Sequence, residues 1–426
     1  MSASLLVLLS FLVVANSFTA LFATPSRYLL SHGHKVAPLR ANARHHVGAA
    51  IDKDKDDVLW SMTSFFSEMV DESSGRFYYL CFPPCGEKQH AFMPIRDLAA
   101  IWDATKALRF WQDNQLPPQR EEQRFAVCDR LSDAVRRSLR AYNSSYMSLA
   151  DGVALDPEIL METPNIAHSA VMILALTGSL RLGDKIEMAP IDALTRGILS
   201  AQLPNGAFCA DFSGSLDGVY IGIEFFPGEA MLALMEVHEL SGTMRGIVVD
   251  ETRNAIIPGM MKAFKFYSEF YYEGNVDTNY NIWQVQAFAR LYDALSAQSG
   301  GKEEMDSLRA YVLDLCDGII DSRSWKYELS RGQSFYQNLE TVEIACGLDS
   351  LADGIRVAYA TDDTAAKAQR LDINIKNAMA FLQWAQRQVP VDSPAGYGGL
   401  GFGGINVLEQ RIDVTGHAIS AFTKML

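Results

Sequence analysis

The sequence predicts an all-α protein in which six helical hairpins form a ring. Past residue 50 the residue pattern is helical almost throughout, without the sustained apolar and polar alternation of a sheet. Two kinds of helix alternate along the chain, one charged on one face and the other poor in charge. This pair recurs six times, so the fold is expected to be built from one repeated unit.

The charged helices are expected on the outside of the ring, because one face of each is hydrophilic and can meet solvent. The six segments of this kind are 52–71, 121–142, 186–202, 250–274, 302–322 and 362–389.

The helices poor in charge are rich in Ala, Gly and Leu, so we expect them to be buried on both sides as an inner ring. They contain the stretches "WDATKAL", "AHSAVMIL", "GEAMLAL", "WQVQAFARL", "VEIACGL" and "GHAISAF". Each stretch carries a polar residue, and these recur every 55 to 74 residues: Asp103, His168, Glu229, Gln284, Glu343 and His417. The resulting architecture is an (α/α)6 toroid, expected as a single domain over residues 51–426.

The connections from each outer helix to the next inner helix are mostly long and rich in aromatic residues, Gly and Pro. Loops of this length in a compact domain are usually functional. All six lead to the amino termini of the inner helices, so they should share one rim. The stretch "RIDVTGHAISAF" (411–422) brings Arg411, Asp413 and His417 to the last of these entrances.

Two carboxylates are the candidate acid and base. Glu224 and Glu229 flank "FFPG", in which Pro227 suits the first turn of a helix. Two carboxylates in different environments can divide into a proton donor and a proton acceptor.

His168 and His417 are the candidate proton carriers. The helix dipole opposes a protonated imidazole in a first turn, so helix capping does not account for them. We expect Asp413 to orient His417 by holding its second ring nitrogen, and Arg411 to bind a carboxylate or phosphate of the substrate.

Further polar and aromatic residues are expected to bind substrate at the same rim. They are Asp103, Asn165, Gln284, Asn338, Glu340, Glu343, Tyr220, Tyr336 and Tyr397. Two other roles stay open, because Asp, Glu and Asn also cap helices and loop aromatics also serve as anchors.

The amino-terminal segment has the features of targeting sequences. Residues 1–17 include the apolar run "LLVLLSFLVVA" of a signal peptide, and residues 18–50 are basic and free of acids, as in a transit peptide. With Phe18 at the junction in "ANSFTA", the segment resembles the bipartite presequences of algae with secondary plastids. The alternative is a secreted protein with a basic propeptide. After processing no membrane anchor is expected.

Nucleic-acid binding is excluded as a function class, because the net charge is −14 and no stripe of Lys and Arg stands out. No metal or cofactor is expected either. Among the six cysteines only Cys81 and Cys85 form a close pair, whose state stays open, and a zinc site would require a second pair. The stretch "GYGGLG" (396–401) has the letters of a dinucleotide fingerprint, but it follows "VDSPA" rather than a strand.

The six-hairpin arrangement resembles the (α/α)6 glycosidase and epimerase superfamily. The stretches "RIDVTGHAISAF" and "FFPGEAMLALMEVHELSG" are also similar to helix entrances in proteins related to the carboxy-terminal domain of D-glucuronyl C5-epimerases. The resemblance implies an acid/base enzyme that acts on a small sugar or oligosaccharide, either a glycoside hydrolase or a sugar or uronate epimerase.

Two other functions stay open. One is an isoprenoid cyclase or prenyltransferase-like α-toroid, although the chain lacks DDxxD and DxDD motifs. The other is a binding toroid without catalysis. The sequence indicates no particular oligomeric state.

Overall fold

The computed structural model describes residues 55–82, 86–90, 93–114, 121–160, 162–274, 278–297, 301–388, 398–401 and 409–426. The expected signal peptide (1–17) and transit segment (18–50) lie outside this part of the chain. Residues Lys53–Leu426 form one compact unit.

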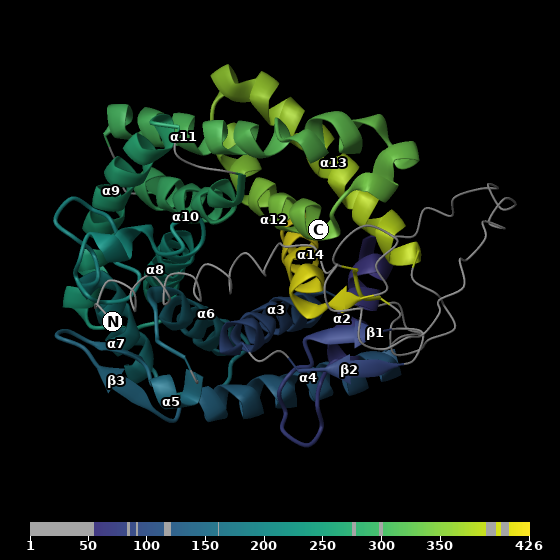
Figure 1. Ribbon diagram of the computed structural model, residues 1–426, viewed down its shortest axis with the longest axis horizontal. Helices are drawn as coiled ribbons and strands as arrows, with labels where there is room; N and C mark the ends of the chain where they lie inside the picture. The colour runs from purple at the N-terminus through teal and green to yellow at the C-terminus, as the bar shows by residue number, and fades with distance from the viewer. Residues whose placement is uncertain are drawn as a thin grey trace, which may run out of the picture. The chain divides into compact units, whose positions relative to one another are not determined.

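Six inner helices form a closed ring (Figure 1). They are α3 (Pro94–Asp113), α6 (Ile166–Arg181), α8 (Phe226–Thr243), α10 (Thr278–Ala297), α12 (Thr341–Ala358) and α14 (Ile412–Met425). Each packs against the next, and α14 packs back against α3.

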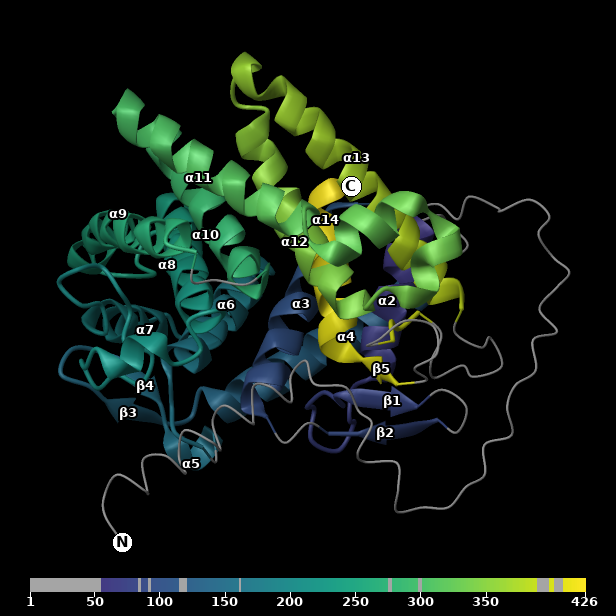
Figure 2. The same cartoon turned by 45° about the horizontal axis from the view of Figure 1, so that its top comes forward.

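Six outer helices surround this ring, each packed against at least one inner helix (Figure 2). They are α2 (Lys55–Glu68), α4 (Glu121–Tyr142), α7 (Ala189–Ser200), α9 (Asp250–Tyr272), α11 (Lys302–Ile320) and α13 (Ala365–Arg387). The predicted all-α (α/α)6 toroid is therefore confirmed, and the predicted outer segments agree with these helices to within a few residues.

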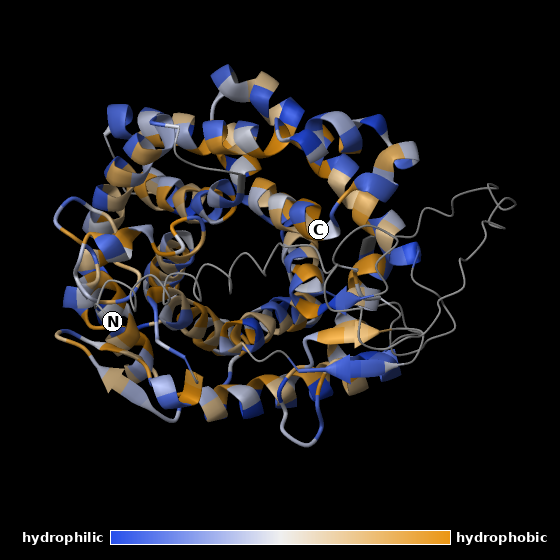
Figure 3. Ribbon diagram, in the orientation of Figure 1, coloured by the Kyte–Doolittle hydropathy of each residue, from blue (hydrophilic) through white to orange (hydrophobic). Residues whose placement is uncertain are grey.

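The two rings differ in burial as their composition predicts. In α6, 15 of 16 residues are buried, so the helix is apolar almost all round. In α4 only 6 of 22 residues are buried, and its other face is hydrophilic (Figure 3). The hydrophobic effect thus holds α6 between an outer helix and its ring neighbours.

Small residues let neighbouring inner helices approach closely. A Cβ atom at Gly178 of α6 would lie 2.2 Å from Thr105 Oγ1 of α3. At Gly416 of α14 it would lie 2.0 Å from Asp103 Oδ2, also of α3. Glycine is therefore required at these two contacts by packing rather than by backbone conformation.

The described parts of the loops contain short strands and short helical turns. The strands are β1 (Leu80–Phe82), β2 (Glu87–Gln89), β3 (Tyr146–Ser148), β4 (Val153–Leu155) and β5 (Gln410–Arg411). The short helical turns are α5 (Pro157–Leu160), η2 (Asp217–Tyr220), η3 (Ser324–Glu328), η4 (Leu329–Arg331), η5 (Gln333–Asn338) and η6 (Asp362–Thr364).

One small sheet joins the first hairpin to the last. Strand β1 pairs antiparallel with both β2 and β5, and Leu80 lies opposite Arg411. Strands β3 and β4 form a separate antiparallel pair. Cys81 of β1 is buried, whereas Cys85 falls outside the described residues.

No helix in the described ranges is both long and apolar enough to span a bilayer.

Candidate functional site

The amino-terminal ends of the inner helices are here called the N-terminal rim. Among the carboxyl groups at this rim, Glu229 has the environment that best suits proton transfer. It lies in the first turn of α8, where Pro227 needs no hydrogen bond and the Glu229 backbone N–H donates to Phe225 O at 3.0 Å. The side chain is 8% exposed, and its Oε2 has no hydrogen-bond partner among the described residues.

Burial raises the pKa of Glu229 to about 7, although the cations of Arg96 and His417 lower it in part. The group therefore exchanges a proton near neutral pH. The two cations can stabilise the carboxylate that remains after it has donated.

His417 is held by helix α12. It is the sixth residue of α14, so it lies in the second turn and not in the first as expected from the sequence. Its Nδ1 lies 3.2 Å from Asp349 Oδ2, and its ring meets Trp283 edge-on at 5.7 Å. Burial alone lowers the pKa of His417, but Cys346 and Asp349 raise it well above its ordinary value. The imidazole is thus held as a cation at neutral pH.

Asp413 does not orient His417, contrary to our expectation. Arg411 donates to both its oxygens, at 3.0 and 2.5 Å, and Arg96 and the Tyr79 hydroxyl also bond to Oδ2. Burial raises the pKa of Asp413, but Arg96 and Arg411 bring it well below its usual range. These three partners take up the carboxylate that we had assigned to the histidine.

Arg411 is correspondingly occupied. The residue is 5% exposed, and its guanidinium donates to both oxygens of Asp413 and lies 5.0 Å from the centre of the Tyr79 ring. The structure therefore shows this cation in a buried clamp at the base of α14, and its expected contact with a substrate anion has no support in this geometry.

His168 takes part in helix capping, so our premise about it was wrong. Its Nδ1 accepts from the backbone N–H of Asn165, while Asn165 Oδ1 accepts from the backbone N–H of His168. Nε2 lies 2.9 Å from Glu162 Oε1. An imidazole whose Nδ1 accepts a hydrogen bond is not opposed by the helix dipole, and both ring nitrogens are engaged.

Asp103 lies deeper in the ring than the sequence indicated. It is the tenth residue of α3, is 4% exposed, and its Oδ1 accepts from Lys106 Nζ at 3.0 Å. Burial raises its pKa, while Lys106 and then His417 lower it. Gln284 of α10 is 1% exposed, and no partner for its Oε1 occurs in the described part of the chain.

The three predicted residues near the start of α12 differ in how firmly they are held. Glu343 accepts from Ser322 Oγ at 3.2 Å and from Ser324 Oγ at 2.6 Å, which ties it to the loop after α11. Asn338 and Glu340 are exposed. The two serine bonds fix the direction of the Glu343 side chain, and burial raises its pKa.

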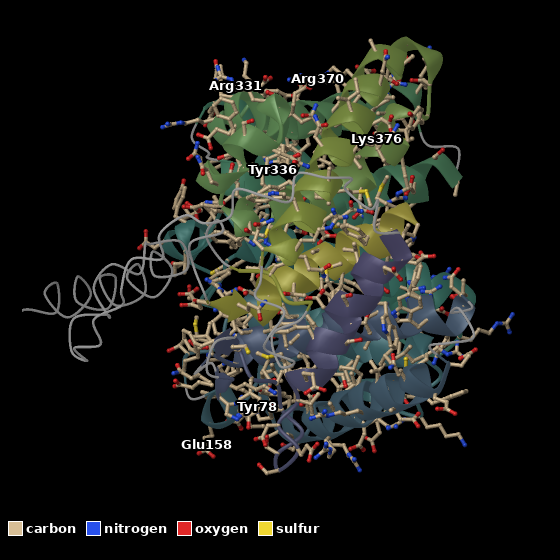
Figure 4. All side chains as sticks on the ribbon, turned by 90° about the vertical axis from the view of Figure 1, so that its right-hand side faces the viewer. Tyr78, Glu158, Arg331, Tyr336, Arg370 and Lys376 are labelled. Carbon is tan, nitrogen blue, oxygen red and sulfur yellow. The ribbon has the colours of Figure 1, made fainter. Side chains whose placement is uncertain are left out.

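Two of the predicted aromatic rings line no shared site. Tyr336, which is labelled in Figure 4, is buried. Its ring packs edge-on against Phe381 and Trp384 of α13, at 5.1 and 5.2 Å. Tyr220 is 63% exposed and lies 6.4 Å from Phe270 of α9. Tyr336 thus anchors its loop to an outer helix, which is the alternative that the sequence left open, whereas most of Tyr220 is exposed to solvent.

Of the remaining predicted residues, Glu224 is half-buried two residues before α8. Tyr397 lies outside the described residues.

Sequence reasoning missed a column of charged residues inside the ring. Lys424 Nζ lies 2.6 Å from both Asp349 Oδ1 and Asp353 Oδ2, and Lys106 lies on the neighbouring helix α3. The available signal was Asp349 and Asp353, four positions apart in an otherwise apolar helix, where buried charges need partners. No cluster of His, Cys, Asp or Glu in the described ranges is arranged to hold a metal ion.

The opposite ends of the inner helices, here called the C-terminal mouth, are hollowed by two cavities of about 400 and 830 Å³. Both are lined by Glu239, Arg290 and Lys424. The charges at this mouth are already paired, since Glu236 bonds to Arg181 at 2.6 Å and also to Arg290. This mouth therefore carries a network of ion pairs, whereas the incompletely bonded Glu229 belongs to the other rim.

No family model matches the chain, and no curated protein matches its sequence. Among solved structures it is similar to an inactive variant of an alpha-1,6-mannanase from Salegentibacter sp. HEL1_6, determined in complex with alpha-1,6-mannotriose. The identity is 8%, the TM-score is 0.49, and the match covers 87% of this chain and 98% of the mannanase chain. The (α/α)6 toroid itself is established by the closed ring of inner helices in this chain.

Proposed function

We propose that this protein is a carbohydrate-active acid/base enzyme in which Glu229 at the N-terminal rim donates the proton. The single observation that carries the proposal is the state of Glu229. It is a buried carboxyl group with an unbonded oxygen and a pKa of about 7, near the cations Arg96 and His417. The toroid supports a sugar as substrate class, because the families that the sequence resembles act on carbohydrates.

Hydrolysis of a glycosidic bond fits these residues better than epimerisation. Hydrolysis requires an acid that protonates the leaving oxygen, and a raised carboxyl pKa provides it. An epimerase with two histidines requires neutral imidazoles that can accept a proton. The raised pKa of His417 keeps that ring protonated, and both nitrogens of His168 are engaged in the cap and with Glu162.

The roles follow from this difference. Glu229 protonates the leaving group, and Glu224 in the preceding loop is the carboxylate proposed to act as base or nucleophile. Arg96 and His417 stabilise negative charge at the site rather than exchanging protons.

The test is a panel of α- and β-linked oligosaccharides, with release of reducing ends as the readout. E229Q should lose about 10²- to 10⁴-fold in rate, the range for removal of a general acid. The control E239Q changes the same residue type on the same helix, at an exposed position of the C-terminal mouth, and should keep the wild-type rate. Wild-type turnover by E229Q would overturn the proposal. Exchange of a carbon-bound proton for deuterium while the glycosidic bond stays intact would indicate an epimerase.

A further inference from the structure

Asp349 is a carboxylate that faces two different groups from the middle of the ring. It lies at the centre of α12 and is 0% exposed. Its Oδ2 lies 3.2 Å from His417 Nδ1, and its Oδ1 lies 2.6 Å from Lys424 Nζ. Its pKa is well below the usual range, because Lys424 and His417 outweigh the effect of burial. It is therefore a permanent anion at neutral pH.

We propose that Asp349 is the positioning residue of His417, holding the imidazole as a cation beside Glu229 with its Nδ1–H directed at α12. This inference rests on the proposed function of the N-terminal rim and deepens it. Asp349 touches no reacting atom in this scheme, and it acts through the histidine.

The geometry supports this role in two ways. First, a carboxylate that accepts from one ring nitrogen fixes the orientation and protonation pattern of an imidazole. Second, Asp349 has its own counter-ion, since Lys424 occupies the oxygen that His417 does not. Asp349 thus stays ionised and its Oδ2 remains available for the ring.

The other charged and titratable groups around His417 come from four inner helices. They are Cys346 of α12, Glu229 of α8, Asp103 and Arg96 of α3, and Asp413 of α14. Asp413 is neutralised by two arginines and Asp103 by Lys106. Cys346 of the same helix also bonds the ring, so Asp349 is the one carboxylate among these groups that bonds it directly.

Asp353 provides a matched control. It lies one turn further along α12, is 4% exposed, and accepts from the same Lys424 Nζ at 2.6 Å. Its other partner is Arg356, and no contact between Asp353 and His417 occurs among the described bonds. D349N and D353N thus remove equivalent buried carboxylates, of which only Asp349 touches the histidine.

The experiment is an NMR titration of ring-labelled histidines in the full chain, with the His417 signal assigned from H417Q. D349N should lower the His417 titration midpoint by at least about one pH unit, whereas D353N should leave it near the wild-type value. An unchanged midpoint in D349N, or equal shifts in both variants, would overturn the inference. If D349N does not fold, D349N/K424Q and D353N/K424Q allow the same comparison without the buried lysine.

The activity of the same variants separates this inference from the proposed function. With both correct, D349N lowers kcat by about tenfold or more and alters the pH profile, while D353N does not. A lowered His417 midpoint with unchanged kcat in D349N would show that Asp349 holds the proton on the ring but that turnover does not depend on it. That result would reject the positioning role and leave the proposed function of Glu229 in place. Full activity of E229Q would reject the proposed function, whatever the midpoint shows.

Discussion

Two glutamates on α8 should respond to the same substitution with opposite changes in stability. Glu229 and Glu236 lie seven residues apart on one helix, and both are buried. Burial raises the pKa of Glu229 to about 7. Burial acts on Glu236 in the same direction, but Arg290 and Arg181 lower its pKa to about 2. We therefore predict that E229Q stabilises the fold at alkaline pH and that E236Q destabilises it.

The size of each stability change follows from the difference between the folded pKa and the ordinary glutamate pKa of 4.5. About 2.5 pH units correspond to about 3 kcal/mol in the free energy of unfolding. Folded Glu229 binds a proton more tightly than the unfolded chain, so this contribution is complete below pH 4.5 and is lost as the pH rises to 7. E229Q, which resembles the neutral acid, should be about 3 kcal/mol more stable than wild type at pH 8 and equally stable at pH 4.5.

The contribution of Glu236 to stability depends on pH in the opposite direction. Its folded pKa is depressed, so its contribution is present above pH 4.5 and is lost as the pH falls towards 2. E236Q should be about 3 kcal/mol less stable than wild type at pH 7, and the difference should shrink at pH 3.

Urea unfolding at pH 8, 6, 4.5 and 3, with midpoint and slope fitted separately, measures all of these differences. If E229Q and E236Q destabilised the protein equally at pH 8, Glu229 would be a structural carboxylate like Glu236. The assignment of the proton donor would then fail together with the burial argument.

Two further predictions concern packing and capping. G178A should destabilise the protein by about 1–3 kcal/mol, because the new Cβ would lie 2.2 Å from Thr105. At Gly242 of α8 a new Cβ would meet no atom within 4 Å, so the control G242A should be neutral or slightly stabilising. Thermal melts of the two variants measure the difference. H168Q should retain both fold and turnover, because Gln at this position of α6 can replace the ring in the box with Asn165. Loss of turnover in a folded H168Q would return the histidine to the catalytic residues.

The helices could be predicted from the sequence because composition and periodicity report burial. Segment 121–142 coincides with α4, and the alternation of charged and apolar helices gave the ring. The depth of a residue within its helix was less accessible, because it depends on where the helix begins. Asp103 looked like a rim residue but follows nine helical residues of α3.

The side-chain partners were also beyond the sequence, since they depend on contacts between distant helices. Asp413 is four residues from His417, the spacing of one helical turn, which made it the natural partner. Arg96, 317 positions away from Asp413, bonds to it instead. The carboxylate that bonds His417 is Asp349, 68 positions earlier, and no local pattern connects the two.

The contact between α14 and α3 closes the ring and brings together the two ends of the chain that contribute to the proposed site. Arg96 of α3 and His417 of α14 belong to the first and last inner helices, and both act on Glu229 of α8. An open arc of hairpins would not hold α3 and α14 side by side, so both cations would act on Glu229 together only in the closed ring, and the proposed activity should require that closure. Contacts of such long sequence separation also form slowly. During refolding, activity should therefore appear when the ring of inner helices closes, and later than the helices themselves form.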